Sequence, residues 1–485
     1  MKICKIIIKG FQQFQDTELD FTHPETGEPL NKICLIGQNG TGKSTILGLI
    51  DQFLFHKKIQ KITQGILILQ LQTRSGLFYR IFPHRIGGAD ADICISADID
   101  NFDPNWIKKY QRHLARIDIK KVQHIPNYSY EFFGKDSSYF EFYRNGPEKQ
   151  KIDDEIGQMS QQSNKQNDLI IYSPAEAGQN TYYGVGSVPK TSLNDALQLM
   201  NEFPLRHEVS KATVADMWKM LVHLVKQQES EQQSFELRPE NLEKTKRELI
   251  NEFSKQNPDI LCKLGDLWNS ILNHANLEFD VVGAKRPVQL SENLEVYIRL
   301  KHNGKQHIPY NQLSTGIRDF LFRIGHIYLL FYHRDLRSAF LMVDEPENSL
   351  FPDFLFDLME LYQEIANPPE SPNRTQMFFA THNPIVAAQF EPYERIILEW
   401  QEDGYVKAHK GKAPAGDDPN DVLRQDFELT TLMGKRGQEK WKEYLQLKKQ
   451  ARHEENPEKK TQLVNAALKI GSEYNFPAGN DPSRI

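Results

Sequence analysis

The chain has 485 residues and a formal net charge of −6, so its length allows about two to four domains and its charge gives no overall attraction to nucleic acid. Its four cysteines lie far apart, at positions 4, 34, 94 and 262, which argues against a disulfide framework and against a structural zinc site. The sequence contains no apolar run of about 18 residues and no signal peptide, so we expect a cytoplasmic protein that is not in the membrane.

The segment from Gly37 to Thr45 reads GQNGTGKST and fits the phosphate-binding pattern G-x-x-x-x-G-K-[ST] at every fixed position. An apolar strand is predicted before it at residues 33–36, and an apolar helix face after it at residues 46–50. Glycines let the backbone N–H groups approach phosphate oxygens, and the helix N-terminus adds a partial positive charge. The segment therefore predicts a nucleoside triphosphate site.

Within this loop, Lys43 is expected to reach the β- and γ-phosphates and to act in catalysis, and the Ser44 hydroxyl is expected to ligate Mg²⁺. The predicted nucleotide-binding residues of the loop are Gly37, Asn39, Gly40, Thr41, Gly42, Lys43, Ser44 and Thr45.

The middle of the chain predicts a hairpin, a further strand and then a helical block. Residues 66–71 and 77–82 are predicted to be two strands that pair as an antiparallel hairpin. Residues 168–172 are predicted to be a strand, and the polar stretch 145–167 a loop. Helices are expected from the capping box at 213–216, and at 241–256 and 259–275, with no sustained heptad pattern. A hairpin of 293–300 with 306–309 follows. The Mg²⁺-sensing glutamine stays open among Gln60, Gln64 and Gln123.

Three polar motifs follow, each at the end of an apolar element. Ser314 and Gly316 open a helix-like run at 320–331, which creates an anion-binding helix N-terminus. The strand at 339–343 ends in Asp344, a carboxylate suited to Mg²⁺, and Glu345, which can orient the attacking water. The strand at 377–380 ends at Thr381 and His382, and this histidine can contact the γ-phosphate and the water.

The order of these four motifs resembles the heads of ATP-binding-cassette ATPases. The run DEPENSLFP at 344–352, and the first strand with its aromatic loop at 6–16, are similar to the RecF/SMC-related, OLD-like branch of AAA-family ATPases (overcoming lysogenisation defect). The resemblance covers residues 1–85 and 290–400. Phe351 stands where this branch commonly has His, and Asn383 stands where Ser is more usual.

The resemblance implies that ATP and Mg²⁺ are bound between two head-to-tail subunits. In such ATPases the signature residues, here Ser314 and Gly316, contact the γ-phosphate held by the other subunit's loop. One loop and one signature per chain then require a homodimer or a higher oligomer. The resemblance also implies an α/β P-loop head, with a mixed sheet, an antiparallel N-terminal β-subdomain and an inserted helical lobe.

We divide the chain into four parts. Residues 1–125 form an N-terminal ATPase lobe with the phosphate loop, residues 126–285 an inserted and mainly helical lobe, residues 286–410 a C-terminal ATPase lobe, and residues 411–485 a helical basic tail. Residues 395–400 are expected to be the last strand.

Two basic clusters are candidates for tracking a nucleic-acid backbone, although solvated helix faces give the same pattern. The first contains Lys108, Lys109, Arg112, Arg116, Lys120 and Lys121. The second contains Lys435, Arg436, Lys440, Lys442, Lys448, Lys449 and Arg452. The residues after Trp400 show no acidic set like the TOPRIM nuclease that related OLD proteins carry, and no HNH or PD-(D/E)xK site is found elsewhere. DNA cleavage would therefore need a partner.

Three functions remain open. The first is an ATP-switch ATPase of anti-phage defence or DNA repair that acts on DNA or controls a partner effector such as a nuclease. The second is the ATP-binding subunit of a membrane transporter, against which the helical insert and the Glu-Asn-Ser-Leu-Phe-Pro run at 347–352 argue. The third is a structural clamp that binds ATP and turns it over slowly.

Overall fold

The structure is a computed structural model in which the chain forms two compact units, residues 1–416 and residues 417–485. No helix among the described residues is long and apolar enough to cross a membrane. The described residues are 1–55, 66–73, 76–83, 93–96, 169–175, 206–210, 214–257, 259–284, 297–302, 306–308, 312–334, 339–348, 350–368, 375–414, 418–429 and 431–476.

The first unit is built on a seven-stranded sheet in the order β14-β13-β3-β12-β11-β7-β8. All neighbouring strands are parallel except β13 and β14, which are antiparallel. Every residue of β11 and β12 is buried, as expected for central parallel strands covered on both faces. The strands are β3 (Lys32–Gly37), β7 (Leu169–Ser173), β8 (Arg206–Glu208), β11 (Ala339–Asp344), β12 (Gln376–Thr381), β13 (Arg395–Trp400) and β14 (Val406–Lys410).

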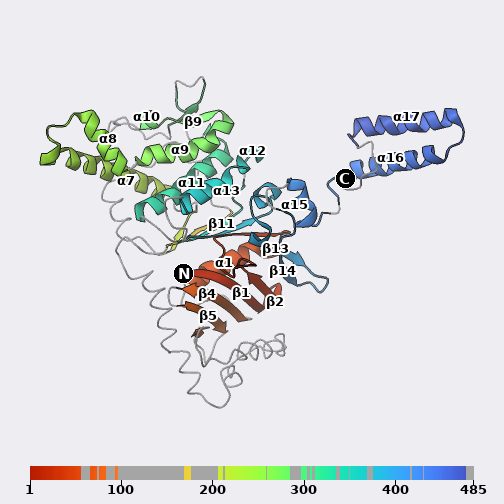
Figure 1. Ribbon diagram of the computed structural model, residues 1–485, viewed down its shortest axis with the longest axis horizontal. Helices are drawn as coiled ribbons and strands as arrows, with labels where there is room; N and C mark the ends of the chain where they lie inside the picture. The colour runs from red at the N-terminus through yellow and green to blue at the C-terminus, as the bar shows by residue number, and fades with distance from the viewer. Residues whose placement is uncertain are drawn as a thin grey trace, which may run out of the picture. The chain divides into compact units, whose positions relative to one another are not determined.

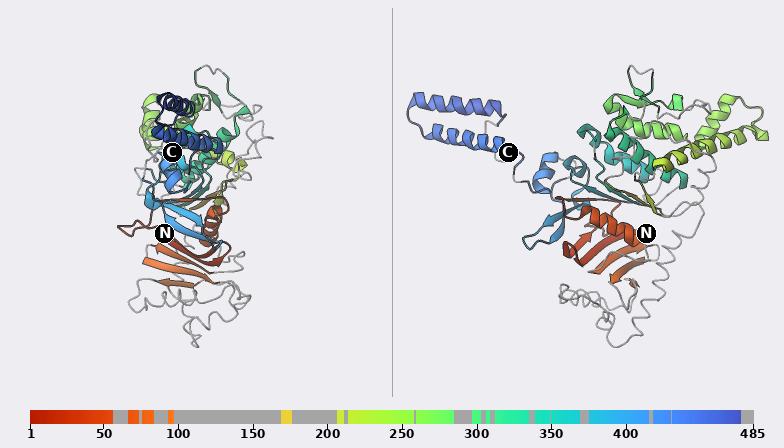
Figure 2. Two further views of the ribbon diagram at one scale, coloured as in Figure 1. Left: turned by 90° about the vertical axis from the view of Figure 1, so that its right-hand side faces the viewer. Right: turned by 180° about the vertical axis from the view of Figure 1, so that it is seen from behind.

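A five-stranded antiparallel sheet in the order β2-β1-β4-β5-β6 forms the N-terminal layer. Helix α1 (Lys43–Phe55) lies between the two sheets (Figures 1 and 2), and its apolar residues share one buried core with strands of both. The strands are β1 (Lys2–Phe11), β2 (Phe14–Asp20), β4 (Ile66–Thr73), β5 (Gly76–Pro83) and β6 (Ile93–Ser96). The α/β fold class, with a mixed sheet and an antiparallel N-terminal sheet, is confirmed.

Helices cover the other face of the central sheet (Figure 1), and α11 (Thr315–Arg334) lies among α7, α9 and α13. The indole nitrogen of Trp268 donates to the carbonyl of Leu321 at 3.1 Å, and the absence of a side chain at Gly325 lets α9 approach α11. The other elements here are α7 (Val214–Glu236), α8 (Lys246–Gln256), α9 (Ile260–Leu272), β9 (Leu277–Phe279), α10 (Val281–Ala284), β10 (Ile298–Leu300), α12 (Pro352–Leu355), α13 (Leu358–Ala366) and α14 (Pro384–Ala387).

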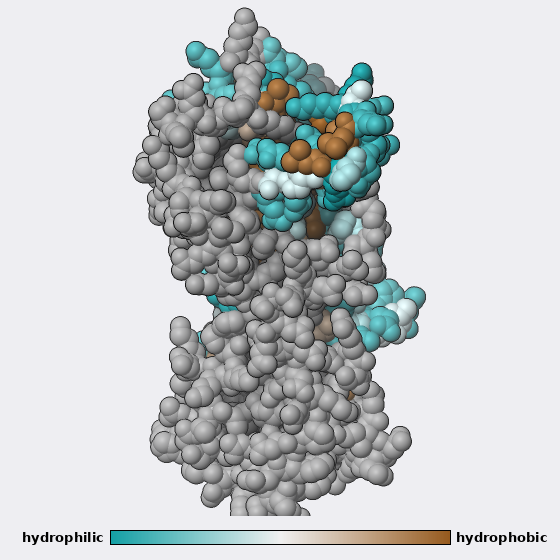
Figure 3. Space-filling model, turned by 90° about the vertical axis from the view of Figure 1, so that its left-hand side faces the viewer, coloured by the Kyte–Doolittle hydropathy of each residue, from teal (hydrophilic) through white to brown (hydrophobic). Residues whose placement is uncertain are grey.

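Apolar side chains reach the surface where α7 and α8 are joined. Figure 3 views the molecule from this side and shows brown apolar atoms among hydrophilic ones. Leu237 is 74% exposed and Leu242 is 68% exposed, so these large apolar side chains are in contact with solvent at the junction of α7 and α8.

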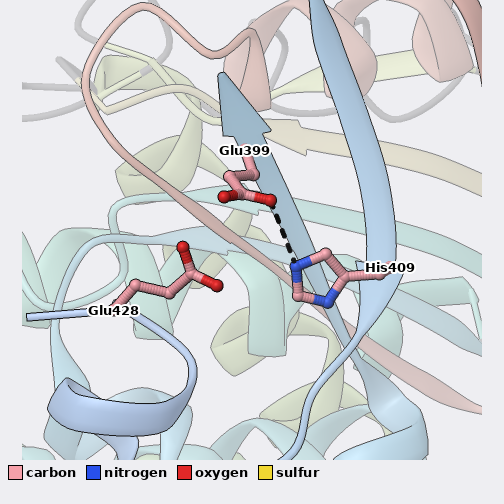
Figure 4. A group of neighbouring side chains, drawn as sticks. All are labelled: Glu399, His409 and Glu428. Atoms are coloured by element: carbon pink, nitrogen blue, oxygen red, sulfur yellow. Dashed lines mark ion pairs between the residues drawn. The ribbon is translucent and has the colours of Figure 1, made fainter. Parts of the chain in front are cut away.

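Two expectations from the sequence were wrong, and a third is only partly tested. Residues 395–400 are not the last strand, because Val406–Lys410 pairs with β13 as β14. The pair Glu399–His409, 3.9 Å apart, lies across these two strands (Figure 4). The predicted hairpin of 293–300 with 306–309 is supported by the bond that the Ile308 N–H donates to the Ile298 carbonyl, and its other residues lie partly outside the described ones. The strand Ile298–Leu300 also pairs with the unpredicted strand Leu277–Phe279, which is too short to show a period. Helix α8 begins later than residue 241, because Thr245 and Glu248 form its capping box.

The other described elements agree with the sequence. The hairpin of 66–71 with 77–82, the strand at 168–172 and the helix at 259–275 are confirmed within a few residues. Thr213 and the stretch 145–167 lie outside the described residues. The four domain boundaries stay predictions, although β7 and β8 place part of residues 126–285 in the central sheet.

The second unit consists of helices. Helices α16 and α17 pack side by side, held by Trp441, Tyr444 and Phe476, whose rings lie 5.0 to 5.6 Å apart. The helices are α15 (Pro419–Gln425), α16 (Lys435–His453) and α17 (Pro457–Glu473). The second basic cluster lies on α16, where Lys440 pairs with Glu443 at 2.7 Å. The first cluster lies outside the described residues.

Candidate functional site

The phosphate loop joins the end of β3 to the start of α1, as its sequence predicts. Gly42 has φ +96°, a left-handed conformation that favours glycine. A Cβ on Gly42 would lie 2.3 Å from Nε2 of Gln13 and 2.5 Å from Cζ of Phe14. The β1–β2 turn therefore packs directly against the loop, and only glycine fits at this position.

The Lys43 side chain lies over the loop and is almost fully buried. Its Nζ donates to the carbonyl of Gly37 at 2.8 Å and to that of Gln38 at 3.3 Å. Burial lowers the pKa of Lys43, while Asp344, Glu345 and Glu347 oppose that shift. Lys43 is thus the one cation of the loop, and the charges of these three acids favour its protonated form.

The remaining loop residues differ in exposure. Asn39, Gly40 and Ser44 are exposed and Thr45 is half-buried. Thr41 is fully buried, and its hydroxyl donates to the carbonyl of Gln38 at 2.8 Å, which closes the turn. Thr41 therefore has a structural contact, while Ser44 offers its hydroxyl to solvent and to the neighbouring strand.

Asp344 ends β11 next to this hydroxyl. Burial raises the pKa of its carboxyl, while a hydrogen bond from Ser44 and the charges of Lys43 and Arg323 lower it. A buried carboxylate beside a serine hydroxyl is an oxygen donor set that suits Mg²⁺. The residues present therefore fit the predicted metal.

The ends of β11 and β12 bring Glu345 and His382 together. Because Asp344 pairs with Ala380 in register, the next residues of both strands leave the sheet at the same edge. Nδ1 of His382 lies 3.4 Å from Oε1 of Glu345, and both side chains are partly exposed. Glu345 has φ +47°, a strained conformation for a residue other than glycine.

Sequence reasoning gave no role to Glu347, which is buried under His382. Its Oε1 accepts from the Thr381 hydroxyl at 2.6 Å and from the His382 N–H at 3.3 Å, and lies 3.7 Å from Nδ1 of His382. Its Oε2 has no hydrogen-bond partner among the described residues. The signal available was a third acid in the run from Asp344 to Glu347, but the contact depends on the pairing of two strands.

Arg323 was also missed. It lies inside the apolar run 320–331 of α11, is 2% exposed, and donates to the backbone carbonyls of Asp344 and Glu345 at 3.1 and 3.3 Å. A charged residue within an apolar helical run was a usable sequence signal, because such residues are rarely buried without a partner.

The signature residues lie at the start of α11. Ser314 is exposed, and its Oγ accepts from the N–H of Ile317 at 3.3 Å, as an N-cap does; Gly316 is buried. The elements with the most contacts to α11 are α7, α9 and α13, and not α1. Gln60, Gln64 and Gln123 lie outside the described residues.

Together these groups can bind a polyphosphate at the loop, hold a divalent cation between Ser44 and Asp344, and place an acid and a histidine beside it. This is the chemistry needed to activate water for attack on a phosphoryl group.

The family described as AAA ATPase domain matches residues 1–387. No curated protein matches the sequence significantly. Among solved structures, the SMC head domain from Thermotoga maritima is similar at 11% sequence identity with a TM-score of 0.37, over 85% of this chain and 100% of that one.

Proposed function

The chain belongs to the AAA ATPase domain family, and from that membership we propose that it binds ATP with Mg²⁺ and hydrolyses it to ADP and phosphate. The observation that carries this proposal is the distance of 3.4 Å between His382 and Glu345 at the edge of the sheet that also carries the phosphate loop and Asp344. A protein that only binds nucleotide would not need an acid and a histidine in contact at this edge of the sheet.

Each residue has a distinct part in this proposal. The loop N–H groups and Lys43 bind the phosphates, and Ser44 and Asp344 hold Mg²⁺, which offsets negative charge on the β- and γ-phosphates. Glu345 orients and polarises the water. His382, held by Glu347, contacts the γ-phosphate and the same water.

We propose that the complete site lies between two chains in a head-to-tail homodimer. The support is the exposed Ser314 at the N-terminus of α11, a helix that packs against α7, α9 and α13 in its own chain. An exposed helix N-terminus suits a γ-phosphate delivered by a second subunit. Two-fold symmetry would then create two equal sites.

The role of the ATP cycle is proposed from the motif resemblance to OLD-like ATPases. In this proposal the ATP-bound dimer acts on DNA, or controls a partner effector such as a nuclease, in anti-phage defence or DNA repair. A slow structural clamp is the second candidate. The basic cluster on α16 gives the DNA role a surface to test, since the charge of the whole chain is negative.

The test compares Mg²⁺-dependent ATP hydrolysis by the wild-type chain and by Glu345→Gln. We expect Glu345→Gln to bind ATP normally but to lose turnover by ~10²-fold or more. Glu360→Gln, an exposed acid on α13, is the matched control and should keep full activity. A Glu345→Gln chain that hydrolyses ATP at the wild-type rate would contradict the assignment, and negligible wild-type turnover would favour the clamp.

A further inference from the structure

The side chain of Arg323 connects the ends of two central strands. Its guanidinium donates to the backbone carbonyls of Asp344 at 3.1 Å, Glu345 at 3.3 Å and Pro174 at 3.4 Å. Pro174 directly follows β7, the strand that pairs with β11. A planar guanidinium can donate in several directions at once. The buried Arg323 therefore fixes the backbone at the point where β11 ends.

Glu345 needs such support. Its φ of +47° is an unfavourable conformation for a residue with a side chain, and it persists only when the surroundings impose it. Its N–H donates to the carbonyl of Ala380 at 2.8 Å, on β12. Its own carbonyl accepts from Arg323 at 3.3 Å and from the N–H of Asn348 at 3.1 Å. The peptide groups on both sides of the Glu345 Cα are therefore fixed, and together they set the direction of the carboxylate.

We propose that Arg323 is a positioning residue of the ATPase site: it holds the Glu345 backbone in the left-handed conformation that directs the carboxylate to His382. The inference rests on the proposed hydrolytic role of Glu345. It extends that role to a buried residue on the signature helix.

A purely structural role has to be distinguished from this one. Arg323 also lies 3.4 Å from Oδ2 of Asp319, one turn earlier on α11. Removing either member of a buried pair leaves an unpaired charge and destabilises the fold whatever the site does. The test therefore needs a variant without that charge and a readout that stability alone does not move.

Two variants meet this need. Arg323→Lys keeps the charge but has a compact ammonium in place of the planar fork, so it cannot reach all three carbonyls in the same geometry. Arg323→Met combined with Asp319→Leu replaces the whole pair by apolar groups of similar volume, which often preserves folding. Arg395→Lys is the matched control, because Arg395 is also fully buried and donates to the carbonyl of Pro414. Arg395 is the first residue of β13, whereas the phosphate loop lies beside the other end of that strand, where Leu398 pairs with Gly37.

We expect both Arg323 variants to lose kcat by ~10-fold or more while the Kd for ATP stays within about twofold, because a small displacement of a catalytic group is costly. Arg395→Lys should keep the wild-type kcat. In a Glu345→Gln background, replacing Arg323 should cost no further activity, since residues that act through one group are not additive.

Unchanged kcat in a folded Arg323 variant would overturn the proposal, as would losses that multiply in the Glu345→Gln background. A loss of ATP affinity in step with melting temperature would also contradict it, because it would indicate a general structural role. These outcomes differ from failure of the proposed function, which would show as a wild-type chain without turnover or as an active Glu345→Gln chain.

Discussion

Nδ1 of His382 lies 3.4 Å from Oε1 of Glu345, although the two residues follow different strands. The contact follows from the parallel register of β11 and β12, which delivers both side chains to one edge of the sheet. Glu347 below accepts from the His382 N–H and so limits the histidine to this position. In the function proposed above, this pair orients the attacking water molecule.

His382→Ala should therefore slow ATP hydrolysis by ~10²-fold while leaving ATP binding intact, because in the proposed mechanism the histidine acts on the water and the γ-phosphate and not on the loop. Single-turnover kinetics and calorimetry on the same preparation measure the two effects. If His382→Ala instead weakens ATP binding and keeps kcat, the histidine binds nucleotide only.

Lys43→Ala should abolish ATP binding at micromolar nucleotide, because Lys43 is the only cation between Gly37 and Thr45. Calorimetry is the measurement, with Lys244→Ala in the helical lobe as the control that keeps normal affinity. Unchanged affinity in Lys43→Ala would show that the loop is not the phosphate site.

Gly42→Ala should lower both ATP affinity and melting temperature. The added Cβ would lie 2.5 Å from Phe14, which is fully buried and cannot move away, and φ at this position is +96°. Gly48→Ala is the control, since a Cβ there meets nothing within 4 Å and alanine favours a helix by about 1 kcal/mol. A Gly42→Ala chain as stable and as tight for ATP as Gly48→Ala would contradict the close packing.

Glu347→Gln should change how stability depends on pH. Burial raises the pKa of Glu347 above its ordinary value of 4.5, although hydrogen bonds from Thr381 and the charge of His382 oppose the shift. A carboxyl with a raised pKa in the folded state makes the free energy of unfolding fall as pH rises from 4.5 through the raised value. Glutamine cannot ionise, so the difference in melting temperature, variant minus wild type, should become more positive over that interval. A difference in melting temperature that stays constant or falls over this interval would show that ionisation of Glu347 does not destabilise the folded state.

The phosphate loop and the two strand-end motifs were predictable because each is a local pattern in the sequence. The contacts of Glu347 and Arg323 were not predictable, although both residues stand out in the sequence, since these contacts need the register of β11 with β12 and the packing of α11 on the strand ends. Strand β14 was missed for a related reason. Val406–Lys410 lies at an edge of the sheet and has only one buried residue, so its sequence shows no apolar pattern, and the strand is recognised only by its pairing with β13.

The central claim is a site shared between two chains, and mixing two inactive variants tests it most directly. Ser314→Arg keeps its own loop but places a bulky cation at the exposed N-terminus of α11, where the partner's γ-phosphate would approach. Lys43→Ala keeps its signature but loses its loop. Neither variant alone should form an active site.

In the mixed dimer the intact loop of the Ser314→Arg chain faces the intact signature of the Lys43→Ala chain, so one of the two sites is whole. The measurement is ATP hydrolysis after mixing, with light scattering to show that subunits exchange. The account predicts that turnover returns on mixing. No recovery despite demonstrated exchange would mean that the site is built within one chain, which would contradict the account.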